Sequence, residues 1–257
     1  SEYRLIPAGD PAAEPRLVRP REPGVQYDLE EGGDVFFILT NLDGAKDFKI
    51  MTAPAADPRP ETWTDLVPHE PGRLILSVMG FRDFMIRLER KDGLPRIVVR
   101  ERASGEEHFI SFDEEAFSLG LSGSYEYDTD VMRFSYSSMT TPAQLFDYDM
   151  RTRERTLLKT QEVPSGHDPE NYVTRRLMPP SHDGELVPIS LIHHRDTPLD
   201  GTAPLPPVAI SSTSYGTPTL PLGSCVFRSV IAGLSTMMRR LMDASLPWLS
   251  RTSSTKS

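Results

Sequence analysis

Serine, histidine and cysteine are the side chains of this chain that could act as nucleophile or base in a hydrolytic reaction. A serine hydrolase holds its nucleophile on a strained strand-to-helix turn, usually within Gly-x-Ser-x-Gly, and adds a histidine and a carboxylate. The nearest match is Gly120-Leu121-Ser122-Gly123-Ser124, which ends in serine and reads as part of a strand and its turn. Gly223-Ser224-Cys225 has no matching context either. We therefore expect no catalytic residue in this chain.

Six histidines are present, and His193 and His194 are adjacent. Neighbouring residues of a strand point to opposite faces, so these two side chains cannot easily share a metal ion. No second cysteine or His-x-Glu pair supports them. The sequence therefore predicts neither a metal site nor a cofactor site. Cys225 is expected to be a small packing residue, as are Met237, Met238 and Trp248.

The acidic runs Glu106-Glu107 and Asp113-Glu114-Glu115 could attract a basic peptide. Charge runs of this kind are more often solvated faces, and we expect that here. Arginine and acidic residues are interleaved through residues 1–160, and the formal net charge is −9. This distribution excludes a segregated basic patch, so nucleic acid is not an expected partner.

The elements that would position these groups repeat at a period of about 48 residues. Phe36, Phe84 and Met132 are 48 positions apart, and each lies in an apolar run that predicts a strand. In each unit a turn follows, and then a second run. The turns are Asp43-Gly44, Asp92-Gly93 and Thr141-Pro142, all of them turn-forming pairs. Every unit also opens and closes with a short run, which gives four strands.

Four strands per unit with this period are typical of a β-propeller blade. The predicted runs are 25–28, 35–40, 48–51 and 62–66, then 73–78, 84–89, 96–99 and 108–112, then 118–121, 131–136, 144–148 and 155–158. Residues 3–6 and 16–19 look like the last two strands of an earlier blade. The chain is thus predicted to be mainly β, with about three and a half blades of a partial propeller. A β-sandwich with coincidental spacing is the alternative.

The pattern changes after residue 160. Residues 161–169 read as a linker, and 172–178 and 186–193 as a hairpin around Asp183-Gly184. Pro188 within the second strand indicates an edge position. Residues 207–210 could add a third strand, and 227–241 could form a helix. We predict a partial propeller over 1–163, a linker and first strands over 164–216, and a divergent tail over 217–257 that is helical or disordered.

The bulk composition favours a soluble chain. No run of about 18 apolar residues predicts a membrane-spanning helix, so no membrane partner is expected. No secretory signal is evident, and a single cysteine excludes an intramolecular disulfide, which favours the cytoplasm. The chain opens at Ser1 without methionine, as expected of a sequence that begins inside a longer one.

Several of these residues resemble oligopeptidase B, of the prolyl oligopeptidase family of serine peptidases. Residues 37–50 and 136–142 resemble its propeller blades. Residues 161–168, with Tyr172 and Arg175-Arg176, resemble the segment that leads into its α/β-hydrolase domain, and 183–191 the first hairpin of that domain. The resemblance covers about residues 1–205. It implies a cytosolic enzyme that cuts short peptides after Arg or Lys, with a propeller that excludes large substrates.

Past residue 205 the sequence departs from that family. Only Ser214-Tyr215-Gly216 matches its aromatic-glycine strand, and Ser212 stands where an oxyanion-binding tyrosine would be. A truncated gene with a shifted reading frame would produce such a tail. We therefore expect a fragment that supplies the gating propeller part, lacks the Ser/Asp/His triad and is inactive alone. It would associate through exposed blade edges. The alternatives are a stand-alone propeller-type interaction module and a nonfunctional product.

Overall fold

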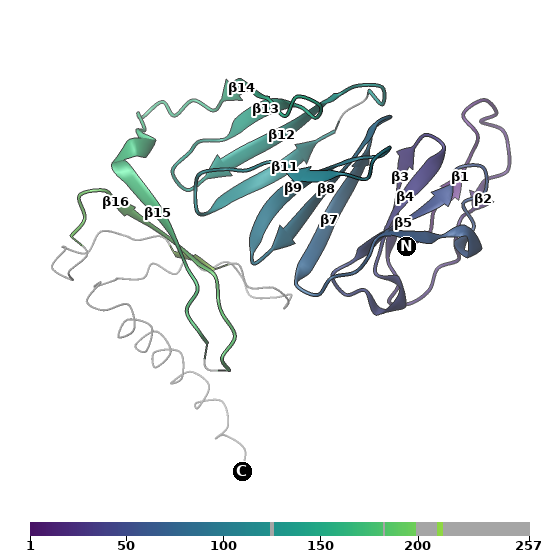
Figure 1. Ribbon diagram of the computed structural model, residues 1–257, viewed down its shortest axis with the longest axis horizontal. Coiled ribbons are helices and arrows are strands. Elements are labelled where there is room, and N and C mark those ends of the chain that lie inside the picture. The colour runs from purple at the N-terminus through teal and green to yellow at the C-terminus, as the bar shows by residue number, and fades with distance from the viewer. Residues whose placement is uncertain (124–125, 182, 199–209, 213–257) are drawn as a thin grey trace, which may run out of the picture. The chain divides into compact units, whose positions relative to one another are not determined.

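A computed structural model describes residues 1–123, 126–181, 183–198 and 210–212 (Figure 1). Within these residues almost all regular structure is antiparallel β-sheet, and the only helices are three short 3₁₀ turns. None of the helices in the described part is long and apolar enough to cross a membrane. The predicted helix over 227–241, Cys225, Met237, Met238 and Trp248 lie outside the described residues.

Contacts along the chain divide it into two compact units. The first comprises Ser1–Asp113, Phe117–Ser138 and Pro142–Glu162. The second comprises Glu114–Ala116, Met139–Thr141 and the chain from Val163 onward. Each unit is described separately below.

The first unit contains three four-stranded sheets, each a simple up-and-down meander. The first sheet contains β3 (Tyr27–Gly32), β4 (Val35–Thr40), β5 (Lys49–Pro54) and β6 (Thr64–Val67). The second contains β7 (Arg73–Gly80), β8 (Phe84–Lys91), β9 (Leu94–Glu101) and β10 (Glu107–Phe109). The third contains β11 (Phe117–Ser122), β12 (Val131–Ser138), β13 (Gln144–Asp149) and β14 (Arg155–Thr160). A two-stranded piece, β1 (Arg4–Leu5) with β2 (Arg16–Leu17), precedes them.

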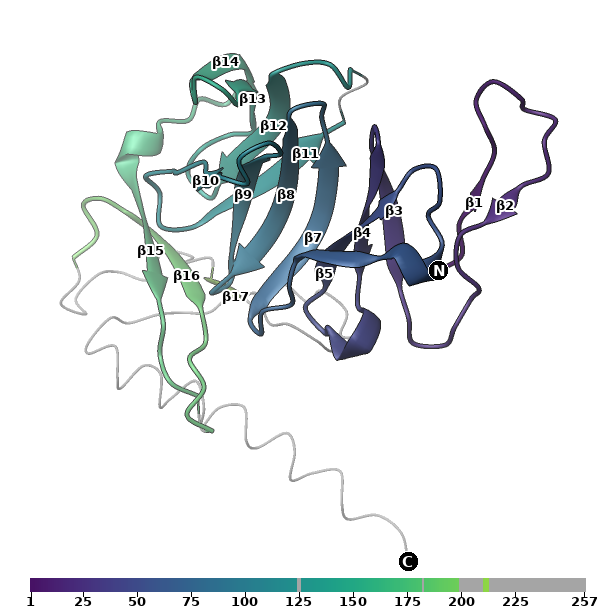
Figure 2. The ribbon, with the colours of Figure 1, turned by 45° about the vertical axis from the view of Figure 1, so that its right-hand side comes forward.

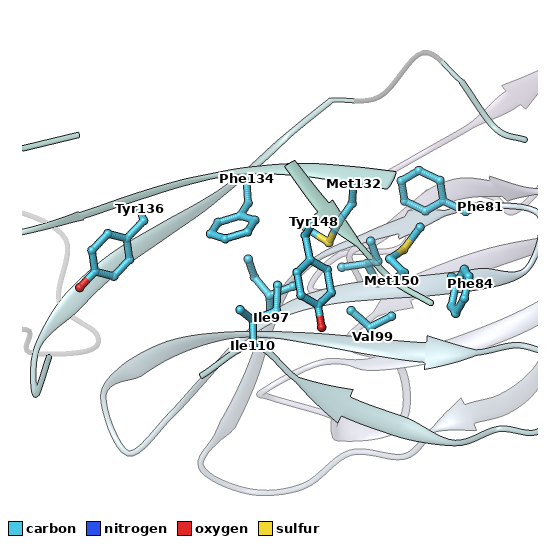
Figure 3. Packing of buried hydrophobic residues seen from close by; sticks show 11 residues of the cluster. Phe81, Phe84, Ile97, Val99, Ile110, Met132, Phe134, Tyr136, Tyr148 and Met150 are labelled. Carbon is cyan, nitrogen blue, oxygen red and sulfur yellow. The ribbon is translucent and has the colours of Figure 1, made fainter. Parts of the chain in front are cut away.

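The successive sheets of the first unit lie side by side (Figure 2). Clusters of buried apolar side chains join them. One cluster lies between β1–β2 and the first sheet and includes Val18 and Ile38. A second joins the first and second sheets through Phe37 and Met85. The largest joins the second and third sheets, and Met132, Phe134 and Tyr136 project into it from one strand, β12 (Figure 3). Because a single sheet of this size cannot bury both faces, this stacking is the arrangement of β-propeller blades.

The repeat is real, but one predicted equivalence is wrong. Phe36, Phe84 and Met132 do lie in the second strand of successive sheets, β4, β8 and β12. Phe36 and Met132 face the preceding sheet, whereas Phe84 packs into the cluster that follows its own sheet. The true counterpart is Met85, which faces the first sheet. The spacing is therefore 49 and then 47 residues, and a shift of one residue along a strand reverses the face.

The second unit contains a three-stranded sheet in the order β15–β16–β17. Its strands are β15 (Tyr172–Leu177), β16 (Ile189–His194) and β17 (Ile210–Ser212). The predicted hairpin is confirmed, with Gly184 at positive φ in its connection. The expectation of an edge strand containing Pro188 is wrong, because β16 begins after Pro188 and is the central strand. A proline at the entrance of a strand leaves the ladder intact, since it removes no hydrogen bond from it.

Candidate functional site

The run that comes closest to a nucleophile elbow lies inside a sheet. Ser122 is the last residue of β11 and pairs with Arg133 of the neighbouring strand. Gly120 lies close to the neighbouring strand, because a Cβ atom there would lie 2.8 Å from the hydroxyl oxygen of Ser135 and would displace it. The described residues include no α-helix that could follow such a turn. The geometry around Ser122 is therefore that of a blade strand.

The two adjacent histidines lie on β16 with different surroundings. His193 is buried, with 9% of its surface exposed, whereas 47% of the His194 side chain is exposed. Nδ1 of His193 lies 2.8 Å from the carbonyl oxygen of His194. In the part of the chain that the structure describes, no three His, Cys, Asp or Glu side chains form a group that could hold a metal ion.

The acidic runs are engaged by cations and hydroxyls of the same chain rather than simply solvated. Glu106 pairs with Arg153 at 2.8 Å. The carboxylate of Glu114 accepts hydrogen bonds from the hydroxyls of Thr140 and Thr141 at 2.9 and 2.6 Å. Glu106 and Glu114 in these two acidic runs thus contribute contacts within the fold.

A cluster of paired charges lies in the second sheet, around a carboxylate that is fully buried. Glu89 has no exposed surface and accepts a hydrogen bond from Nε of Arg87 at 2.7 Å and another from Arg96. The guanidinium of Arg87 also binds Glu107 in a bidentate manner, with both distances 2.8 Å. Burial alone would raise the pKa of Glu107, but the hydrogen bonds and charges of Arg87 and Arg100 hold that pKa below its ordinary value. Buried charges paired in this way fix the strands against one another.

The segment that joins the two units is shaped by a turn and a short helix. Gly166 takes a φ of +79°, and its N–H donates to the carbonyl of Val163. Asp168 then caps the 3₁₀ turn Pro169–Asn171 by accepting the N–H of Glu170 at 3.0 Å. This turn leads directly into β15, so the predicted linker has a defined conformation.

Within the second unit, aromatic contacts hold the start of β15, and contacts with Glu115 hold its end. The rings of His167 and Tyr172 stack with centroids 5.7 Å apart, and Tyr172 meets His194 edge-on. Glu115 accepts the backbone N–H of Arg176 at 2.7 Å and the side chain of Arg175 at 3.0 Å. The N–H of Arg176, and then the guanidinium of Arg175, lower the pKa of Glu115. These contacts tie β15 to the segments around His167 and Glu115 within the second unit.

Comparison with protein families explains this arrangement. A model described as the N-terminal β-propeller domain of prolyl oligopeptidase matches residues 1–161. The chain belongs to the prolyl oligopeptidase family. The three sheets and the two-stranded piece are therefore blades of the family's propeller.

The chain is similar to curated members of this family beyond its propeller part. It is 39% identical over 217 residues to dipeptidyl aminopeptidase BI of Pseudoxanthomonas mexicana, covering 84% of this chain and 29% of that protein. It is 28% identical to Protease 2 of Moraxella lacunata, covering 84% of this chain and 30% of that protein. The chain thus spans less than a third of the length of these relatives.

Solved structures show the same relationship. Oligopeptidase B from Leishmania major matches with a TM-score of 0.67 and 31% identity, covering 75% of this chain and 28% of that one. Oligopeptidase B from Trypanosoma brucei, with covalently bound antipain, matches with a TM-score of 0.64 and 33% identity, covering 72% and 27%.

Sequence reasoning missed two arginines at the ends of the third strands. Arg102 and Arg151 are 49 residues apart and each bonds to an aspartate of the preceding sheet. Their spacing in the sequence could have revealed them, because 49 residues is close to the period of the strand repeat. It was hidden by the many other charged residues around them.

Proposed function

We propose that this chain is the gating part of a serine peptidase that hydrolyses short peptides after Arg or Lys in the cytoplasm. The observation that carries the proposal is the succession of propeller sheets, followed by a hairpin that resembles the start of the family's hydrolase domain. The nucleophile, base and orienting carboxylate would come from polypeptide outside this chain. Stacked sheets contribute by excluding large folded substrates from the active site.

The first test is hydrolysis of arginyl and lysyl chromogenic peptides. The isolated 257-residue chain should give no turnover above background. The longer protein in which this sequence occurs should cleave arginyl and lysyl substrates at least about tenfold faster than prolyl ones, since recognition of a charged side chain is worth more than about 1.4 kcal/mol. A serine-directed reagent should abolish this cleavage.

Two outcomes would contradict the proposal. Reagent-sensitive turnover by the isolated chain would show that it carries its own nucleophile. Preference of the longer protein for prolyl substrates would remove the assignment to Arg and Lys. A large folded protein serves as the control for gating, because it should be cut far more slowly than a short peptide of the same sequence.

A second candidate is an interaction module without catalysis, which binds a partner through the sheets. The outer strand of the third sheet, β14, favours it, because all six of its residues are exposed and, among the described residues, it pairs only with β13. Such a module should remain monodisperse, with a cooperative melting transition of its own. A nonfunctional product would instead be poorly soluble, because an exposed strand edge pairs with other chains.

A further inference from the structure

Three Asp-Gly pairs lie in turns of the described chain, at Asp43-Gly44, Asp92-Gly93 and Asp183-Gly184. In such a pair the peptide nitrogen of glycine can attack Cγ of the aspartate and close a five-membered succinimide ring. Glycine favours this attack, because it has no Cβ atom to obstruct the approach and its backbone is adaptable. Whether a given pair reacts therefore depends on what else binds the carboxylate and the glycine N–H.

Asp92-Gly93 forms the whole connection between β8 and β9, and neither reacting group is engaged. Lys91 pairs directly with Leu94, so the loop has only two residues. Their φ angles are +51° and +78°, as a tight hairpin turn requires, and the first is costly for an L side chain. Asp92 is exposed. Among the described residues, none bonds to its carboxylate, and none accepts the N–H of Gly93.

Asp43-Gly44 has nearly the same backbone, but its carboxylate is restrained. The φ angles are +58° and +79°. Nζ of Lys49 binds Oδ2 of Asp43 at 3.1 Å. The same ammonium binds Asp65 at 3.0 Å, and only 9% of the Lys49 side chain is exposed, so this cation is held in place. Ring closure at Asp43 must break the ion pair.

Asp183-Gly184 has both reacting groups engaged. The N–H of Gly184 donates to the carbonyl of Ser181 at 3.0 Å. Oδ1 of Asp183 accepts the N–H of Glu185 at 3.2 Å. Ring closure here must break two hydrogen bonds. Of the three described pairs, Asp92-Gly93 therefore has the least to lose on reaction.

We propose that Asp92 is a modification site, which converts spontaneously to isoaspartate and then becomes the substrate of a carboxyl methyltransferase specific for L-isoaspartyl residues. In the first step the nitrogen of Gly93 bonds to Cγ, and the carboxyl hydroxyl leaves as water with the amide proton. Water then adds to the former main-chain carbonyl carbon of Asp92 and breaks its bond to nitrogen. The main chain now runs through Cβ and Cγ, and the mass is unchanged.

The product explains the need for the second enzyme. Isoaspartate adds one backbone atom to a two-residue connection whose geometry must match the twist of β8 and β9. The third pair of strand residues from this turn is Glu89 with Arg96, which belongs to the buried charge cluster. A methyltransferase would move a methyl group from a sulfonium donor to the new carboxylate. The resulting ester loses methanol to re-form the succinimide, whose hydrolysis can restore aspartate.

The test follows isoaspartate in the whole chain during incubation at neutral pH and body temperature. Peptides from each time point are separated and located by electron-transfer fragmentation, which distinguishes isoaspartate from aspartate. Asp92 should convert at least about fivefold faster than Asp43 or Asp183, a difference of about 1 kcal/mol in activation free energy. In concentrated urea the three rates should agree within about twofold, because the contacts that distinguish the sites are lost.

The second readout is methyl transfer. A purified L-isoaspartyl methyltransferase with labelled S-adenosylmethionine should label the aged chain and not the fresh one. Asp92→Gly keeps a favourable turn residue but removes the carboxyl group, so it should lose most of the label. Asp92→Asn should gain label faster than wild type, because ammonia is lost in place of water. Circular dichroism checks that both variants are folded.

Lys49→Gln is the matched control for restraint. It releases the Asp43 carboxylate, so isoaspartate should rise at Asp43 and stay unchanged at Asp92. Equal rates at the three sites of the folded chain would overturn the proposal, as would an absence of isoaspartate at Asp92. Label that survives in aged Asp92→Gly would also overturn it, because the methyl acceptor would then be another residue.

Discussion

At the scale of single residues, the charges of this chain act mainly on one another. Glu89, Arg87 and Glu107 form a cluster in the second sheet in which one carboxylate is fully buried. The apolar run at residues 84–89 predicted β8 but gave no sign of this cluster, because Arg87 and Glu89 share a face that would otherwise be apolar. An ion pair inside a sheet interface depends on partners from other strands, which a local pattern does not contain.

Glu89→Gln should destabilise the first unit by about 3–5 kcal/mol, because Arg87 and Arg96 would lose a shared buried counter-charge. Urea denaturation followed by fluorescence measures the change. Glu61→Gln, at an exposed site, is the control and should change the free energy of unfolding by no more than about 0.5 kcal/mol. Equal effects of the two substitutions would show that Glu89 is not held as described.

His108 should make stability depend on pH. Burial, and after it the charge of Arg153, lowers the pKa of His108 below its ordinary value of 6.5, against an opposing contribution from Glu106. The folded chain therefore resists protonation of this ring more than the unfolded chain does. Its contribution to stability is fully present above pH 6.5 and is lost as the pH falls through the folded pKa.

The check is the free energy of unfolding between pH 7 and pH 5, measured for wild type and His108→Gln. The variant should show a flatter pH dependence, because glutamine does not titrate and can still reach the hydroxyl of Tyr148, which lies 2.9 Å from His108. A His108→Gln slope identical to wild type would refute the assignment.

At the scale of elements, the apolar layers between sheets hold the first unit together. Phe134 has no exposed surface and stacks on Phe146 at 5.3 Å between centroids. Phe134→Ala should cost about 3–5 kcal/mol, since it leaves a cavity between the second and third sheets. Leu157→Ala removes a half-exposed side chain of β14 and should cost no more than about 1 kcal/mol in the same thermal or urea unfolding experiment. Similar losses would mean that the layer is not packed as described.

Gly33 is required by both its backbone and its neighbour. Its φ is +74°, and a Cβ atom there would lie 2.5 Å from the hydroxyl of Tyr127. Gly24 has a similar φ of +82° with no atom nearby. Gly24→Ala should therefore cost only the backbone strain, about 1–2 kcal/mol, and Gly33→Ala should cost more.

A double-mutant cycle tests why Gly33→Ala should cost more stability than Gly24→Ala. Tyr127→Phe removes the colliding hydroxyl, so Gly33→Ala should be less costly in the Tyr127→Phe background than in wild type. Its cost should approach that of Gly24→Ala. If the cost of Gly33→Ala is the same in both backgrounds, the collision with Tyr127 is not its cause.

The elements could be predicted because each carries its own signal. Apolar runs, followed by the turns Asp43-Gly44 and Thr141-Pro142, predicted β4 and β12 to within a few residues. The position of Phe84 was misjudged because a constant period of 48 was imposed on a repeat that drifts. Pro188 was misjudged because proline marks a strand boundary as readily as an edge. The pairing of Arg102 and Arg151 with earlier sheets required the fold, since it joins residues 68 apart.

At the scale of the whole molecule, the strand edge of β14 has no β-sheet partner among the described residues. All residues of β14 are exposed, and 45% of the surface of Leu158 faces solvent. Such an edge pairs readily with other chains. Leu158→Lys should slow association in a light-scattering time course by about threefold or more, because a charge on an edge strand opposes pairing.

The control for that effect is Ile6→Lys, which changes the net charge equally at a side chain that is 49% exposed and lies outside the third sheet. It should leave the association rate within about twofold of wild type. If both substitutions slow association equally, net charge rather than the strand edge controls the behaviour of the chain.

The spacing between equivalent residues of successive second strands changes from 49 to 47. This change has a consequence for how such chains tolerate insertions and deletions. Each second strand is anchored by the carbonyl of Asp34, Asp83 or Asp130 to the end of the third strand in the same sheet. The start of the second strand is thus fixed relative to the third strand within each sheet. A change in the length of a connection between sheets therefore does not alter the strand register of later sheets. Alignments of related propellers should place their gaps just before this aspartate, and a one-residue deletion after it should be far more damaging than one before it.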